Sequence, residues 1–353
     1  MKDFIEEGHQ GYPNLRHKPL IDSIIAHVKK TASYEINREQ VAYFLNSQNF
    51  VLTTLQAVKQ LHQNKTNNNN LNVLVVTPAE PELLSQIQKM ESVNLFTSAL
   101  KYSKEKKGFV VDLEGVKKIV EEKKIQAFVV QTTNLVTGSV LPADQVKNLV
   151  QMCEKKDIYL LVNEQGADLI QKQSLSENYV SALNYVTKEE ALVAALLDGQ
   201  PCYNIQYFNS AFGVILNKEF KQMQSDKNVQ SGIYSLSILG QALLEALYTS
   251  ETGICEYKKE LEQNYQTLIN GINQNNLFIS QLQTGYYVYC NYENTSIPRG
   301  QVQQVFDEQK IKIEHLDQFY FPNKKETREF YVNIGVSNKD VQALNQVLTK
   351  IFA

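Results

Sequence analysis

The sequence has 353 residues, 43% hydrophobic and 21% charged, which suits a globular chain with one large domain and a smaller one. The net charge of −3, without a basic stripe, argues against a nucleic-acid partner. No run approaches the roughly 18 apolar residues of a membrane span. The four cysteines stand far apart and form no CxxC or Cys/His cluster, so we expect no metal site and predict buried free thiols.

The first ten residues, MKDFIEEGHQ, are acidic and lack the apolar core of a secretory signal. We therefore expect a soluble, intracellular chain in the cytoplasm, with the mitochondrial matrix as the alternative. The polar run NKTNNNN at 64–70 predicts a surface loop.

The first third of the chain predicts helices alternating with a strand. Apolar residues recur at helical spacing in 19–32 and again in 50–63. The β-rich run at 71–78 ends at a turn proline and predicts a buried strand, and 82–92 is helical again.

The alternation continues through the middle of the chain. Asp112 is a good N-cap for a helix that leads into a strand at 125–131. A helix over 141–157, with Pro142 near its start, precedes a continuously apolar strand at 158–164. This order predicts βαβ units in a mostly parallel sheet, whose ligands sit at the carboxyl ends of the strands.

The pattern changes near residue 230. A long helical segment over 235–274 is followed by strand-like pieces and by a last helix over 338–352. We therefore expect three parts: an N-terminal arm and helix that packs with the small domain (1–35), a large α/β domain (36–232), and a connecting helix with a small α+β domain (233–353).

Several motifs in this order resemble the class I/II aminotransferases, which are fold-type-I enzymes that use pyridoxal phosphate (PLP). The turn TTNLVTG at 132–138 is similar to the family's N-P-x-N-P-T-G, and NEQGAD at 163–168 is similar to its D-E-x-Y-x-D. Segments at both ends of the chain resemble the family as well. The resemblance implies a mostly parallel, seven-stranded-type sheet sandwiched by helices, plus a smaller C-terminal α+β domain.

The resemblance also implies where PLP contacts would fall. PLP chemistry needs a Schiff-base lysine, a carboxylate at the pyridinium nitrogen, ring and phosphate partners, and an arginine for the substrate carboxylate. The matching positions hold other residue types. They are Glu80 for the stacking aromatic, Leu135 for the turn asparagine, Asn163 for the pyridinium carboxylate, Gly166 for the tyrosine, Tyr203 for the lysine, Ala211 for the phosphate arginine and Asn333 for the substrate arginine.

From these positions we interpret the chain as a non-catalytic, aminotransferase-like pseudoenzyme: no enzyme, with no catalytic residues and no cofactor. The predicted role is structural, as a homodimer, beside an aminotransferase-like paralogue, or within a larger assembly. One alternative is a metabolite-sensing regulator whose re-lined cleft uses Glu80, Asn163, Glu164 and Tyr203. The other is an active aminotransferase with an atypical site.

Overall fold

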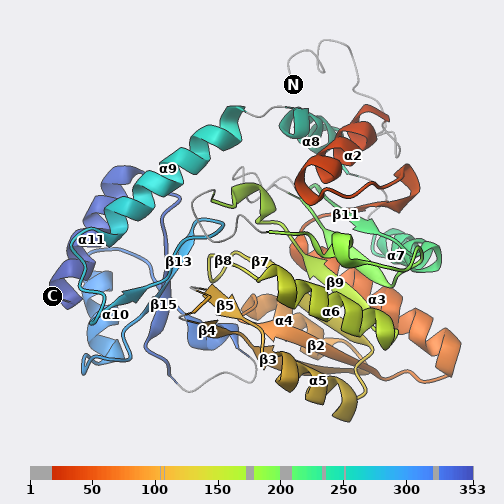
Figure 1. The fold of residues 1–353 in the computed structure, drawn as a ribbon, viewed down its shortest axis with the longest axis horizontal. Helices are drawn as coiled ribbons and strands as arrows, with labels where there is room; N and C mark the ends of the chain where they lie inside the picture. The colour runs from red at the N-terminus through yellow and green to blue at the C-terminus, as the bar shows by residue number, and fades with distance from the viewer. Residues whose placement is uncertain are drawn as a thin grey trace.

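The computed structural model describes residues 18–103, 105–106, 108–171, 179–198, 209–232, 236–249, 252–320 and 326–352. Its main feature is a seven-stranded sheet (Figure 1). The strand order is β1 (Val41–Phe44), β11 (Ala211–Ile215), β10 (Val193–Leu196), β9 (Tyr159–Asn163), β6 (Ala127–Gln131), β2 (Leu71–Thr77) and β3 (Val93–Ala99). The strands from β10 to β3 are parallel, whereas β11 is antiparallel to both of its neighbours.

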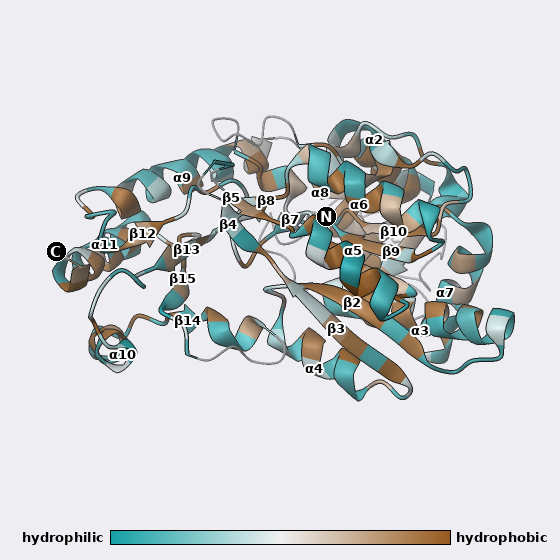
Figure 2. Cartoon of the chain, turned by 60° about the horizontal axis from the view of Figure 1, so that its bottom comes forward, coloured by the Kyte–Doolittle hydropathy of each residue, from teal (hydrophilic) through white to brown (hydrophobic). Residues whose placement is uncertain are grey.

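Helices cover both faces of this sheet. One face carries α3 (Ser47–Thr66), α4 (Pro81–Lys89) and α7 (Lys218–Gln230), and the other carries α2 (Lys18–Ala32), α5 (Leu113–Glu122) and α6 (Ala143–Lys155). In β2, Val73 and Val75 pack into the first layer while Leu74 and Val76 pack into the second, because side chains alternate along a strand. Figure 2 shows largely hydrophobic strands between helices with hydrophilic outer sides. The predicted α/β fold is confirmed.

Short elements complete this part of the chain. They are η1 (Arg38–Gln40), the hairpin of β4 (Lys101–Ser103) and β5 (Gly108–Val110), the hairpin of β7 (Thr133–Asn134) and β8 (Ser139–Val140), η2 (Ala167–Leu169) and η4 (Ala182–Tyr185).

A second, antiparallel sheet belongs to the C-terminal part. Its order is β12 (Phe278–Ile279), β13 (Tyr287–Asn291), β15 (Glu329–Asn333) and β14 (Glu314–His315). One face packs Val288, Cys290, Phe330 and Val332 into an apolar cluster. That cluster also takes in α9 (Thr252–Ile269), α10 (Arg299–Glu308) and α11 (Asn338–Phe352), and η7 (Leu316–Phe319) follows β14.

The predicted helix over 235–274 is two helices, α8 (Ile238–Thr249) and α9. The N-terminal helix α2 packs against α8, and its apolar face joins the core on one side of the large sheet. We keep the division at 35/36 and 232/233 as a proposal. It is supported by the placement of the two sheets in residues 41–215 and 278–333.

Two further sequence predictions concern the cysteines and membrane-spanning segments. Cys153 and Cys290 are buried free thiols, as predicted, but Cys255 is exposed, and Cys202 lies outside the described residues. Within the described ranges, no helix is both long enough and apolar enough to cross a membrane.

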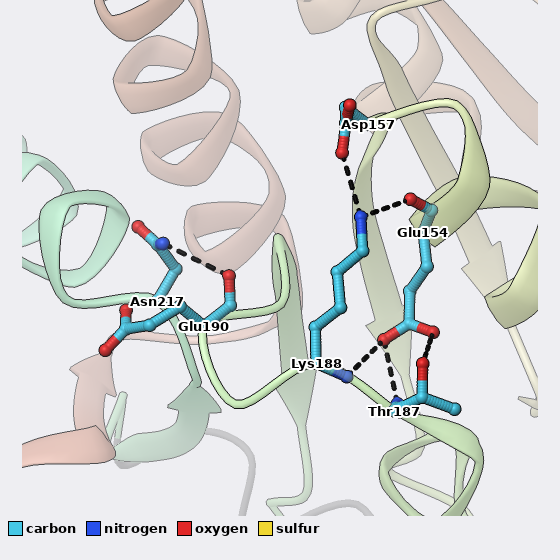
Figure 3. Close-up of polar contacts among 6 residues, drawn as sticks. All are labelled: Glu154, Asp157, Thr187, Lys188, Glu190 and Asn217. Carbon is cyan, nitrogen blue, oxygen red and sulfur yellow. Dashed lines mark hydrogen bonds and ion pairs between the residues drawn. The ribbon is translucent and has the colours of Figure 1, made fainter.

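Glu154, at the end of α6, ties that helix to the segment that leads into β10 (Figure 3). Its carboxylate accepts hydrogen bonds from the Thr187 backbone N–H (2.9 Å) and hydroxyl (2.8 Å), and from the Lys188 backbone N–H (3.2 Å). The Lys188 ammonium donates to the Glu154 carbonyl at 2.7 Å and pairs with Asp157 at 3.0 Å. Glu154 is itself only 9% exposed, so its carboxylate makes these bonds largely shielded from water.

Glu154→Ala is therefore expected to lower the free energy of unfolding by about 2 kcal/mol, because it removes three hydrogen bonds to a largely buried carboxylate. Urea denaturation measures the change. The matched control is Glu122→Ala, which removes an exposed ion pair with Lys118 at 3.8 Å and should change stability by less than ~0.5 kcal/mol. Equal effects of the two substitutions would contradict the structural role of Glu154.

Candidate functional site

A cleft of about 900 Å³ lies between the carboxyl edge of the large sheet and the second sheet. Parallel strands β6, β9 and β10 end at this edge, where open α/β sheets bind their ligands. From the large-sheet side the cleft is lined by Gln48, Glu80, Glu82, Leu135, Gln165 and Asp198. From the other side it is lined by Tyr286, Tyr287, Arg299, Lys312, Glu314, His315, Phe319 and Tyr331.

Asp198, just beyond the end of β10, forms part of the cleft floor. It is 1% exposed and accepts hydrogen bonds from the Gln165 amide and the Tyr248 hydroxyl, both at 3.2 Å. Gln165 is itself held by Asn163, whose Oδ1 accepts from the Gln165 backbone N–H at 3.0 Å. Asp198 was not predicted from the sequence, although an acidic residue directly after the apolar run LVAALL was an available signal.

Behind the floor, His27 of α2 stacks on Tyr248, with ring centroids 4.2 Å apart. The His27 Nε2 lies 3.4 Å from the Asp168 carboxylate. Burial lowers the pKa of His27, and Asp168 acts in the opposite direction. No partner of His27 could be predicted from the sequence, because 141 positions of chain separate it from Asp168 and only the fold brings α2 to this edge.

Glu80 stands at the N-cap of α4 and faces the cleft. Its Oε2 accepts a hydrogen bond from the Gln48 amide at 3.1 Å. Burial raises the pKa of Glu80, the hydrogen bond from Gln48 acts against that rise, and the neighbouring Glu82 carboxylate adds to it. The sequence prediction that Glu80 belongs to the pocket is consistent with this placement.

Glu164 was expected among the polar contacts of the cleft, and that expectation is wrong. The side chain is 1% exposed, does not line the cleft, and accepts bonds from Ser181 Oγ (2.5 Å), the Ala182 N–H (2.8 Å) and Thr132 Oγ1 (3.2 Å). Burial raises the pKa of Glu164, and these hydrogen bonds act against that rise. Glu164 therefore joins the end of β9 to the start of η4.

Leu135 and Gly166 meet at the edge of the cleft. A Cβ built on Gly166 would lie 2.8 Å from Thr284 Oγ1 and 3.0 Å from Leu135 Cδ2, and one on Gly285 would lie 2.9 Å from the same Leu135 atom. Leu135 therefore packs between two glycines, in space where a larger side chain at position 166 would collide.

The remaining predicted positions are scattered. Asn163 lines a separate small cavity with Glu80, beneath the main cleft. Ala211 is a fully buried residue of β11, paired with Phe44 of β1. Asn333 is exposed at the end of β15, where it accepts a bond from the Gly335 N–H at 2.7 Å, and it does not line the cleft. Tyr203 lies outside the described residues.

The chain matches the family model described as aminotransferase class I and II over residues 7–191, more than half of its length. Among curated proteins, none matches. The fold is shared with many solved structures, three of which follow. Cystalysin from Treponema denticola, which contains PLP, has a TM-score of 0.86 at 12% identity, covering 99% of this chain and 85% of that one. A PLP-bound C-S lyase from Staphylococcus hominis has a TM-score of 0.84 at 15% identity, covering 100% and 83%. N-succinyldiaminopimelate aminotransferase from Mycobacterium tuberculosis has a TM-score of 0.84 at 13% identity, covering 100% and 88%.

These comparisons correct one sequence prediction. The chain was predicted not to be an enzyme, but the family model is that of an enzyme family, and the matching structures are of an aminotransferase and of PLP-containing relatives. The prediction is therefore contradicted. At identities of 12–15% the structures themselves show the shared fold.

The described residues of this cleft do not fit PLP in the way that the resemblance would require. Asn163 is neutral and its amide is engaged by Gln165, so it offers no carboxylate to a pyridinium nitrogen. Leu135 presents an apolar side chain beside Gly166, where the resemblance implies two hydrogen-bond partners of the ring hydroxyl. No step through PLP follows from the described residues.

Proposed function

Because the chain belongs to the class I and II aminotransferase family, we propose that it binds a small molecule in the cleft at the carboxyl edge of its large sheet. The observation that carries this proposal is the lining of that cleft. Buried or half-buried polar side chains, Asp198, Gln165 and Glu80, converge there from three different segments. A cleft of about 900 Å³ has the size of known small-molecule sites.

Metabolite sensing, one of the alternatives raised by the sequence, is the form of this function that the geometry supports best. The polar contacts differ from those first expected. Glu80 remains, Glu164 is replaced by Asp198 and Gln165, and the second sheet adds tyrosines and cations.

A thermal-shift screen of the full chain against amino acids, keto acids, amines and sugars tests the proposal. A ligand present at 100 times its Kd adds about 2.7 kcal/mol to stability, which corresponds to a rise in Tm of about 3–4 °C for a chain of 353 residues. The variant Asp198→Asn, which keeps the buried shape but removes the charge, should weaken binding of any ligand that the screen finds. If no compound in the screen raises Tm, the proposal fails.

We keep as a proposal that the chain pairs with itself or with an aminotransferase-like relative, since the family is expected to be dimeric. Its support is the family membership alone. Light scattering of the purified chain measures the mass, and a monomer at all concentrations would contradict self-pairing.

A further inference from the structure

The second sheet presents a run of aromatic rings to the cleft. Tyr286 and Tyr287 have ring centroids 4.9 Å apart, Tyr287 and Tyr331 4.6 Å, and Tyr331 and Phe319 5.3 Å. All four residues line the cleft. Tyr287 and Tyr331 share one face of the sheet because their strands, β13 and β15, are paired with Tyr289 opposite Tyr331. We call these four residues the aromatic wall.

Besides Asp198, two carboxylates of the large-sheet side line the same cleft. Glu80 and Glu82 flank Pro81 at the start of α4. Glu80 is bonded to the neutral amide of Gln48. Among the described residues, no ion pair involves either Glu80 or Glu82.

The cations of the cleft, in contrast, already have carboxylate partners. Lys312 pairs with Glu314 at 2.7 Å, and Arg299 pairs with Asp317 at 3.1 Å. Tyr331 also donates its hydroxyl to Glu314 at 2.6 Å, which holds the ring in place. The charge that the cleft offers to a ligand is therefore mainly negative.

We propose that the cleft takes an organic cation, an amine or quaternary ammonium group, placed between Glu80 and Glu82 and the aromatic wall. This inference rests on the proposed function, since it names the class of ligand for the same cleft. A cation over a tyrosine ring, within about 6 Å of its centroid, is attracted by the negative face of the ring. A carboxylate opposite supplies the counter-charge as the cation loses water.

Isothermal titration of the full chain with choline and tetramethylammonium, at fixed ionic strength, tests the inference. The controls are 3,3-dimethylbutanol, a neutral molecule with the shape of choline, and the dianion glutarate. We expect both cations to bind at least 10-fold more tightly than either control. Equal binding of choline and dimethylbutanol, or a preference for glutarate, would overturn it.

The same panel separates the two proposals. If glutarate or another anion binds and the cations do not, the cleft is a ligand site but the inference about cations is wrong. If none of these probes and no compound of the thermal-shift screen binds, both fail.

Substitutions then locate the site. Glu82→Gln and Glu80→Gln should each weaken choline binding about 10-fold, whereas Glu114→Gln, on the exposed surface of α5 (84% exposed), should leave it unchanged. Tyr331→Leu should weaken the binding of choline and tetramethylammonium more than the binding of the neutral dimethylbutanol. Glu82 is exposed, so Glu82→Gln is expected to fold even if a substitution at Tyr331 does not. Unchanged choline affinity in both glutamate variants would contradict the site.

The pH dependence of choline affinity distinguishes a direct role of Glu80 in binding from a purely structural one. Other charged groups line the cleft as well, namely Glu82, Asp198, Arg299, Lys312, Glu314 and His315. Burial raises the pKa of Glu80, so its carboxylate charges at a higher pH than an ordinary glutamate. Choline affinity should therefore increase as the pH rises through that range, and Glu80→Gln should flatten the increase. A slope unchanged in Glu80→Gln would remove Glu80 from the site.

Discussion

Gly138→Ala is expected to lower the free energy of unfolding by roughly 2–5 kcal/mol. Gly138 has φ of +63°, a left-handed conformation that alanine adopts at a cost. A Cβ there would lie 2.2 Å from the backbone oxygen of Tyr287. The Gly138 carbonyl also accepts bonds from the N–H groups of Gln283 (2.9 Å) and Thr284 (3.2 Å). The turn between β7 and β8 is thus pressed against the segment that enters β13.

Two other glycines serve as controls that distinguish the cost of a left-handed backbone from the cost of a steric clash. Gly232 and Gly271 have φ of +78° and +75°, and a Cβ at either meets nothing within 4 Å. Alanine at each should cost only about 1 kcal/mol. Chemical denaturation of the three variants measures the difference. If Gly138→Ala costs no more than the two controls, the close approach to Tyr287 is not present in solution.

Glu164→Ala is expected to cost roughly 2–4 kcal/mol, because it leaves the donors of Thr132, Ser181 and Ala182 unpaired in a buried place. Glu114→Ala, at an exposed position of α5 whose side chain pairs with Lys117 at 2.7 Å, is the matched control and should cost less than ~0.5 kcal/mol. Denaturation midpoints at constant m-value check both. A loss below ~1 kcal/mol for Glu164→Ala would mean that water or another residue replaces the carboxylate.

The pH dependence of stability follows from the same residue. Burial raises the folded-state pKa of Glu164 above that of an unfolded glutamate, so the unfolded chain loses this proton first as the pH rises. The contribution of Glu164 to stability is therefore greatest below the unfolded pKa and falls as the pH rises toward the folded one. Glu164→Gln should remove this part of the slope. If the slope of stability against pH is the same in Glu164→Gln as in the wild type, another titrating group causes that slope.

The sequence by itself determined the order and type of most elements of the large sheet. Buried runs such as LNVLVVT and YLLVN are apolar at nearly every position because parallel strands are covered on both faces, and this pattern is visible in a few consecutive residues. Asp112 was readable as an N-cap, and its side chain accepts from the Gly115 N–H at 3.0 Å. The turn and strand-end motifs also pointed to the family that the comparisons show.

The break between α8 and α9 was not readable, since both sides of it keep helical spacing. The interior position of Glu164 was not readable either. The local sequence does not decide whether a carboxylate that follows a strand faces the cleft or the core. Asn333 matched a pocket position in the resemblance, but β15 ends with this side chain outside the cleft.

Only the tertiary structure decided what faces the cleft. The aromatic wall draws on β13, β15 and η7, and the carboxylates opposite come from the start of α4, more than 200 residues earlier in the chain. Periodicity and capping act over a few residues, so they specify elements but not which elements meet. The meeting of α4 with the second sheet follows from how the two sheets and their helices bury their apolar faces, and the cleft is the space that this packing leaves.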